Sequence, residues 1–161
     1  MLYSLGLSTN TGTYVGDSSG SNVTRSGMQW LKLQISADGT SLTLADHGRI
    51  YDTNHTDNPW WYYMPSMMIN CAGDMVAGFS GSTATNYVST FYTWRLSSGA
   101  MRAQPGLIQA GTRATGSVGD YSATTLDPTD DCTFWTVQQY GNNLNGLATW
   151  GTAITKIRPN P

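Results

Sequence analysis

Several segments of the chain alternate polar and apolar residues, the pattern of a β-strand with one buried face. The three clearest are 28–35, 90–96 and 149–157, which begin about 60 residues apart. Turn-forming residues follow the first two, at 37–40 and 97–100. The pattern therefore predicts antiparallel strands joined by hairpins.

A second strand pattern also recurs, in which an apolar run leads through a turn into another strand. Its two copies are 65–70 with 75–80, and 121–127 with 132–138. Shorter strands are expected at 42–45 and 107–110, and a weaker first copy at 2–8 and 13–16. Four strands per unit, at a period of about 50 to 60 residues, predict an all-β protein of about three four-stranded antiparallel blades of a β-propeller. A β-sandwich is the alternative.

The repeat also predicts how the chain is organised. We expect one domain over residues 1–161, with blade units at roughly 1–50, 51–110 and 111–161. A closed propeller typically has about 4 to 8 blades, so three blades leave open sheet edges. We therefore expect a homodimer or another homo-oligomer that completes the ring, or a chain that is part of a longer propeller.

Charge narrows the choice of partners. Charged residues make up 11% of the chain and the net charge is −2. Without a basic patch, a nucleic-acid partner is not expected. No apolar run approaches the length of about 18 residues that predicts a membrane span, so no membrane partner is expected either. The composition is typical of exported proteins, and we expect secretion, although residues 2–7 are too short for a signal peptide.

Some strings resemble a known family. The segments 30–33, 63–68 and 78–80, and above all 119–122 and 127–135, resemble the carboxyl-terminal blades of large secreted bacterial proteins with sialidase-like β-propellers. The resemblance implies a propeller fold and export. The chain departs from sialidases because it contains no Glu and no Ser-x-Asp-x-Gly-x-x-Trp box, so sialidase chemistry is not implied.

An aromatic string provides the first candidate site. Trp60, Trp61, Tyr62 and Tyr63 are consecutive, and neighbouring residues of a strand point to opposite sides. Some of these rings must therefore reach solvent, a neighbouring loop or another chain. Aromatic faces stack on the apolar surface of sugars, so a glycan is one expected ligand. Internal packing or a subunit contact is the alternative.

The expected propeller places two loops, 51–64 and 112–121, together at the mouth of the channel. The second loop adds Arg113 and Tyr121 to the candidate ligand-binding residues. The same loops contain Asp57 and Asp120, which are candidate carboxylates for a glycoside hydrolase. Besides a carbohydrate-binding module, the function hypotheses are thus a hydrolase and a purely structural assembly domain.

Metal and thiol chemistry remain open. The residues 127–131 form an Asp-rich turn that permits calcium on charge grounds, although Asp in such turns usually bonds its own backbone. Asp46 with His47, and Asp52 with His55 and Asp57, could bind a metal, but a single His in a loop is more often a solvated residue, so no cofactor is expected. Cys71 and Cys132 could pair in an oxidising compartment, or be two separate buried thiols.

Overall fold

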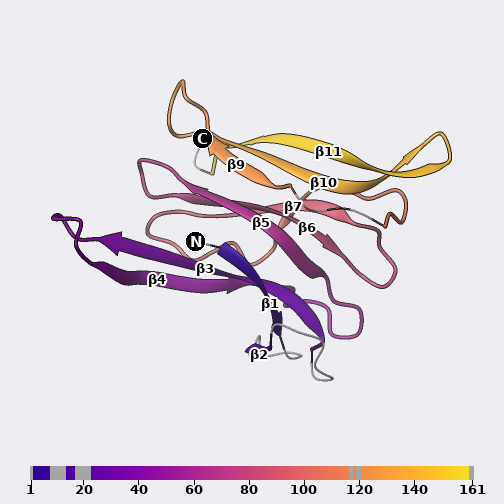
Figure 1. Cartoon of the computed structure of the whole chain (residues 1–161), viewed down its shortest axis with the longest axis horizontal. Helices are drawn as coiled ribbons and strands as arrows, with labels where there is room; N and C mark the ends of the chain where they lie inside the picture. The colour runs from indigo at the N-terminus through magenta and orange to yellow at the C-terminus, as the bar shows by residue number, and fades with distance from the viewer. Residues whose placement is uncertain (1, 8–13, 17–22, 117, 119–120, 160–161) are drawn as a thin grey trace.

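The structure is a computed structural model that describes residues 2–7, 14–16, 23–116, 118 and 121–159. In these residues the chain forms eleven β-strands and no helix, hence no helix that could cross a membrane. The strands build three antiparallel sheets, named A, B and C in chain order (Figure 1). The prediction of an all-β protein with antiparallel sheets is confirmed.

Sheet A contains β1 (Leu2–Leu7), β2 (Tyr14–Gly16), β3 (Arg25–Ile35) and β4 (Leu42–Ile50). A propeller blade would run as a meander through these strands, but the observed order is β2-β1-β3-β4. β1 pairs with β3 through all six of its residues and with β2 through only two, so the longer ladder brings β3 next to β1. The turn expected between β1 and β2 lies outside the described residues.

Sheet B is a meander of β5 (Trp61–Ile69), β6 (Met75–Ser82), β7 (Ser89–Arg95) and β8 (Gly106–Gln109). The sequence placed the start of β5 at Pro65, but the strand begins at Trp61. It continues through the proline because Met64 and Pro65 form a bulge opposite Phe79, and Met64 has a φ of 50°. A bulge needs no ladder hydrogen bond from the proline.

Sheet C has three strands, β9 (Ala123–Leu126), β10 (Phe134–Leu144) and β11 (Leu147–Ile157), in the order β11-β10-β9. The β10–β11 hairpin turns through Asn145 and Gly146, both with positive φ. This two-residue turn matches the right-handed twist of the strands and lets β10 continue beyond the predicted end at residue 138.

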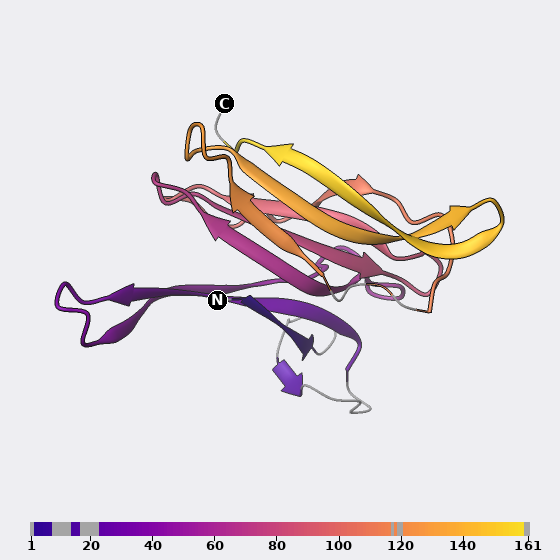
Figure 2. The same cartoon turned by 45° about the horizontal axis from the view of Figure 1, so that its top comes forward.

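Sheet B is the middle of three stacked layers, with sheet A on one face and sheet C on the other (Figures 1 and 2). Alternate residues of β6 therefore enter different cores. Phe79 packs with Trp30 in the core between sheets A and B, whereas Val76 packs with Phe134 in the core between sheets B and C. This double burial explains why β6 is buried along almost its whole length.

A network of hydroxyl and amide groups, which we name the polar seam, joins sheets B and C beside their apolar core. Its members are Ser66, Ser122, Thr124, Thr136 and Gln138. Ser66 Oγ lies 2.7 Å from Thr124 Oγ1 and 3.0 Å from Gln138 Nε2, so β5 is bonded to both β9 and β10. Gln138 is fully buried, and its bonds offset the cost of desolvating its amide.

Candidate functional site

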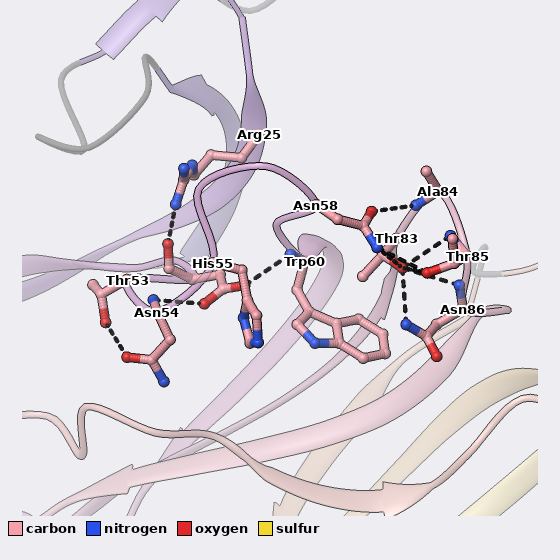
Figure 3. Close-up of polar contacts among 11 residues, drawn as sticks. Arg25, Thr53, Asn54, His55, Asn58, Trp60, Thr83, Ala84, Thr85 and Asn86 are labelled. Carbon is pink, nitrogen blue, oxygen red and sulfur yellow. Dashed lines mark hydrogen bonds and ion pairs between the residues drawn. The ribbon is translucent and has the colours of Figure 1, made fainter.

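Loop 51–60, which connects β4 to β5, is organised by the buried carboxylate of Asp52. Figure 3 shows Asn54, His55 and Trp60 of this loop, which the carboxylate contacts. Asp52 Oδ2 accepts hydrogen bonds from Trp60 N at 2.9 Å and contacts His55 Nδ1 at 2.8 Å, while Oδ1 accepts from Asn54 N at 2.9 Å. An Asp side chain that bonds backbone amides ahead of it closes a turn. Asp52 thereby fixes where the aromatic string begins.

These contacts also set the charge of Asp52. Burial disfavours the carboxylate, but the amides of Trp60 and Asn54 and the ring of His55 outweigh burial and hold its pKa below the ordinary value. The side chain of Asp52 is 4% exposed and that of His55 is 56% exposed. The loop therefore presents an imidazole whose Nδ1 is held by a carboxylate, while the remaining ring surface is open to hydrogen bonding.

Arg25 supports the same loop from the start of β3. Its guanidinium is buried, and Nη1 donates a hydrogen bond to the backbone carbonyl of Asp52. Its Nε and Nη2 have no hydrogen-bond partner among the described residues. Arg25 has no local sequence motif that would point to it, because its partner Asp52 lies 27 residues away.

A cluster of amides and hydroxyls, which we name the Asn58 cluster, joins this loop to the β6–β7 turn (Figure 3). Asn58 Nδ2 donates to Thr85 Oγ1 at 2.8 Å, and Asn58 Oδ1 accepts from Ala84 N at 3.0 Å. Thr83 Oγ1 accepts from Asn86 Nδ2 at 2.9 Å. This cluster was also not predictable from a local motif, because Asn58 and the β6–β7 turn are 25 or more residues apart.

The aromatic string is divided between the core and the surface. Tyr62 is 3% exposed and packs edge-on against Phe79, with ring centroids 4.9 Å apart; burial raises its pKa well above the ordinary value. Trp60 packs edge-on against Phe91 at 4.8 Å. Two of the four rings thus contribute to the core between sheets A and B, as the packing alternative describes.

The other two rings lie on the opposite face of β5. Trp61 pairs with Ser82 and is 36% exposed, while the half-buried Tyr63 pairs with Ser80 and donates its hydroxyl to Ser82 Oγ at 3.1 Å. Burial raises the pKa of Tyr63. Ser80 bonds the backbone of sheet C, so this face of β5 is the one directed toward sheet C.

The second candidate loop brings one of its residues to that face. Tyr121 is 77% exposed and directly precedes Ser122, whose hydroxyl donates to Ser66 of β5 at 2.8 Å. Arg113 is instead half-buried, and its backbone lies against Gly141 of β10. The structure therefore brings Tyr121 toward the strand that carries Trp61, and places the backbone of Arg113 beside β10, the middle strand of sheet C.

The structure describes one of the two candidate catalytic carboxylates. Asp57 is exposed, at the tip of loop 51–60. Asp120 lies outside the described residues. The hydrolase alternative thus stays a prediction.

The Asp-rich turn is filled by its own donors. Asp130 accepts hydrogen bonds from Thr133 Oγ1 at 2.7 Å and from the backbone amides of Cys132 and Thr133. These bonds, the one from the Thr133 hydroxyl most of all, lower the pKa of Asp130 to about 2. Asp127 accepts from Trp135 Nε1 at 3.0 Å. Throughout the described ranges, no three His, Cys, Asp or Glu residues gather as metal ligands would.

Comparisons of the chain with protein-family models, with curated proteins and with solved structures gave no match. The resemblance to sialidase-like propellers therefore stays a prediction, and the function of the chain has to be inferred from its own site geometry.

Proposed function

We propose that this protein is a secreted carbohydrate-binding module of the β-propeller type. The arrangement of the sheets supports the propeller part of this proposal. The three sheets form in chain order from segments 2–50, 61–109 and 123–157, and they stack face to face. The β4–β5 and β8–β9 connections each lead from the last strand of one sheet to the first strand of the next. Successive propeller blades are connected in this way.

The ring is completed by a second copy of the chain. Both faces of sheet B are covered, but sheets A and C each have an outer face with exposed apolar side chains. On sheet A the exposed apolar side chains are Leu33, Ile35, Leu42 and Leu44. Leu33 pairs with Leu44 across β3 and β4, and Ile35 pairs with Leu42. On sheet C, Trp150 and Ile154 are 53% and 63% exposed. Sheet A of one copy covers sheet C of the other, so two copies bury both faces.

Trp61 is the observation that carries the ligand proposal. Its ring is exposed on the first strand of the central sheet, and its partner Ser82 is followed directly by Thr83 of the Asn58 cluster. A sugar needs a flat apolar surface for its C–H groups and nearby amides or hydroxyls for its hydroxyl groups. Trp61 supplies the first, and the Asn58 cluster supplies the second. Tyr121 is a second exposed aromatic ring, in the loop whose Ser122 bonds to β5.

The test is a pair of alanine substitutions. An array of soluble oligosaccharides is screened with the purified chain, and the strongest binder is then titrated by calorimetry. We expect Trp61→Ala to weaken that binding by about tenfold or more, because the loss of one stacked ring costs about 1.4 kcal/mol or more.

Leu107→Ala is the control, because Leu107 is also an exposed apolar side chain but lies on β8, outside the Asn58 cluster and outside the two faces that close the ring. Its binding constant should equal that of the unaltered chain. Equal weakening by the two substitutions, or no oligosaccharide bound by the unaltered chain, would contradict the proposal.

A further inference from the structure

We infer that Cys71 and Cys132 form an intramolecular disulfide that ties sheet B to sheet C. Cys71 lies in the turn between β5 and β6, and Cys132 lies in the segment between β9 and β10. Both are free thiols in the structure, and their Sγ atoms are 3.9 Å apart although 61 residues separate them in sequence. This inference is independent of the carbohydrate proposal.

The backbone on each side is already held in place. In the β5–β6 turn, Asn70 N donates to Asp74 O at 3.0 Å and Asp74 N donates to Asn70 Oδ1 at 2.8 Å. On the other side, Cys132 N donates to Asp130 Oδ1 at 3.0 Å.

One bond joins the two segments directly, from Asn70 Nδ2 to the backbone carbonyl of Cys132 at 3.4 Å. Bond formation must shorten the sulfur separation from 3.9 Å to about 2.0 Å, which requires side-chain rotation within a fixed frame.

The thiols are accessible to a dissolved oxidant. Cys71 is exposed, whereas Cys132 is half-buried. A hydrogen bond with the Cys71 thiol, together with burial, raises the pKa of Cys132 above its ordinary value. Cys71 is therefore the thiol that reacts first.

The oxidant that we name is a small-molecule disulfide such as glutathione disulfide. The Cys71 thiol loses its proton, and the thiolate attacks one sulfur of the oxidant and releases one glutathione. Cys132, as its thiolate, then attacks the Cys71 sulfur of the mixed disulfide and releases the second glutathione. Two protein thiols are oxidised and one glutathione disulfide is reduced.

The bond acts at one end of the sheet B–sheet C contact. The polar seam and the core around Val76 and Phe134 hold the middle of that contact, whereas the turns that carry the cysteines lie at an end of their strands. Cross-linking residues 61 positions apart restricts the unfolded chain. We expect the oxidised protein to melt about 5 to 15 °C above the reduced protein.

The folded chain is equilibrated with glutathione buffers of increasing oxidised fraction, and its remaining free thiols are then alkylated in denaturant. The intact mass is measured, and the cross-linked peptides are identified by peptide mapping without reductant. The expected product has lost about 2 Da through two-thiol oxidation and yields one peptide pair cross-linked between Cys71 and Cys132. Its Tm is higher than that of the same sample after reduction.

Cys132→Ser is the control, because it keeps the exposed Cys71 but removes the resolving thiol. It should accumulate as the glutathione adduct at Cys71 without an intramolecular bond. The inference is overturned if the unaltered chain stays reduced, carries two glutathione adducts, or links cysteines of different chains. It is also overturned if the intramolecular bond forms but lowers the Tm.

Discussion

Gly78 provides a sharp test of how closely sheets B and C approach. It lies on β6, where a side chain would point into the polar seam, and a Cβ at this position would overlap Thr136 Oγ1 and crowd Gln138 Nε2. Both neighbours are fully buried and hydrogen-bonded to each other at 2.9 Å. The φ of Gly78 is not positive, so Gly78→Ala tests packing rather than backbone strain.

Three contributions set the change in the free energy of unfolding that Gly78→Ala causes. A methyl group forced into a packed core costs about 1 to 3 kcal/mol. Disruption of one hydrogen bond of the polar seam adds about 1 kcal/mol. The smaller conformational freedom of Ala in the unfolded chain offsets about 0.5 to 1 kcal/mol. We therefore expect Gly78→Ala to lower the free energy of unfolding by about 1 to 3.5 kcal/mol, and the Tm by about 2 to 14 °C.

The assay is urea unfolding followed by far-UV circular dichroism, with Gly116→Ala as the control. Gly116 is exposed, and a Cβ there meets no atom within 4 Å, so its replacement should leave stability unchanged or slightly higher. A Gly78→Ala protein as stable as the Gly116→Ala protein would refute the close contact of sheets B and C.

Two further predictions concern acid stability and assembly. Because contacts in the fold lower the pKa of Asp52, its stabilisation is present above the unfolded carboxyl pKa of about 3.9 and is lost as the pH falls through the folded value. The Asp52→Asn protein should therefore lose less stability than the unaltered chain when the pH is lowered from about 6 to about 2, as measured by thermal unfolding. An equal loss in the two proteins would contradict a stabilising role of the Asp52 carboxylate. Light scattering should give twice the chain mass of 17.4 kDa, with Ile154→Asp shifted toward monomer, whereas a monomeric unaltered chain would contradict ring closure.

Most strand positions could be predicted, because alternation is a local signal. The predicted strand at 75–80 is found as Met75–Ser82 and that at 90–96 as Ser89–Arg95. The start of β5 could not be predicted, because a proline and four aromatics indicate a loop unless a bulge absorbs the proline. That bulge depends on the register of β5 against β6, in which Tyr63 pairs with Ser80 and Ser66 with Gly78, and no local pattern records this register.

The candidate site was predictable only in part. The aromatic string is visible in the sequence, and its division follows from strand alternation, but which rings enter the core depends on the sheet that packs there. Tyr62 is buried against Phe79 of the next strand, whereas Trp61 lies on the other face. The partner of Asn58 is a turn more than twenty residues later, so the polar half of the site had no sequence signal.

By itself, the sequence determined the class of fold and most of the places where the chain forms strands. The tertiary structure decided the pairing of β1 with β3, the middle position of sheet B and the proximity of Cys71 and Cys132. The physical reason is that a period-two pattern records that one face of a strand is buried. It does not record which sheet buries that face, because apolar contact has no direction and any apolar surface can provide it.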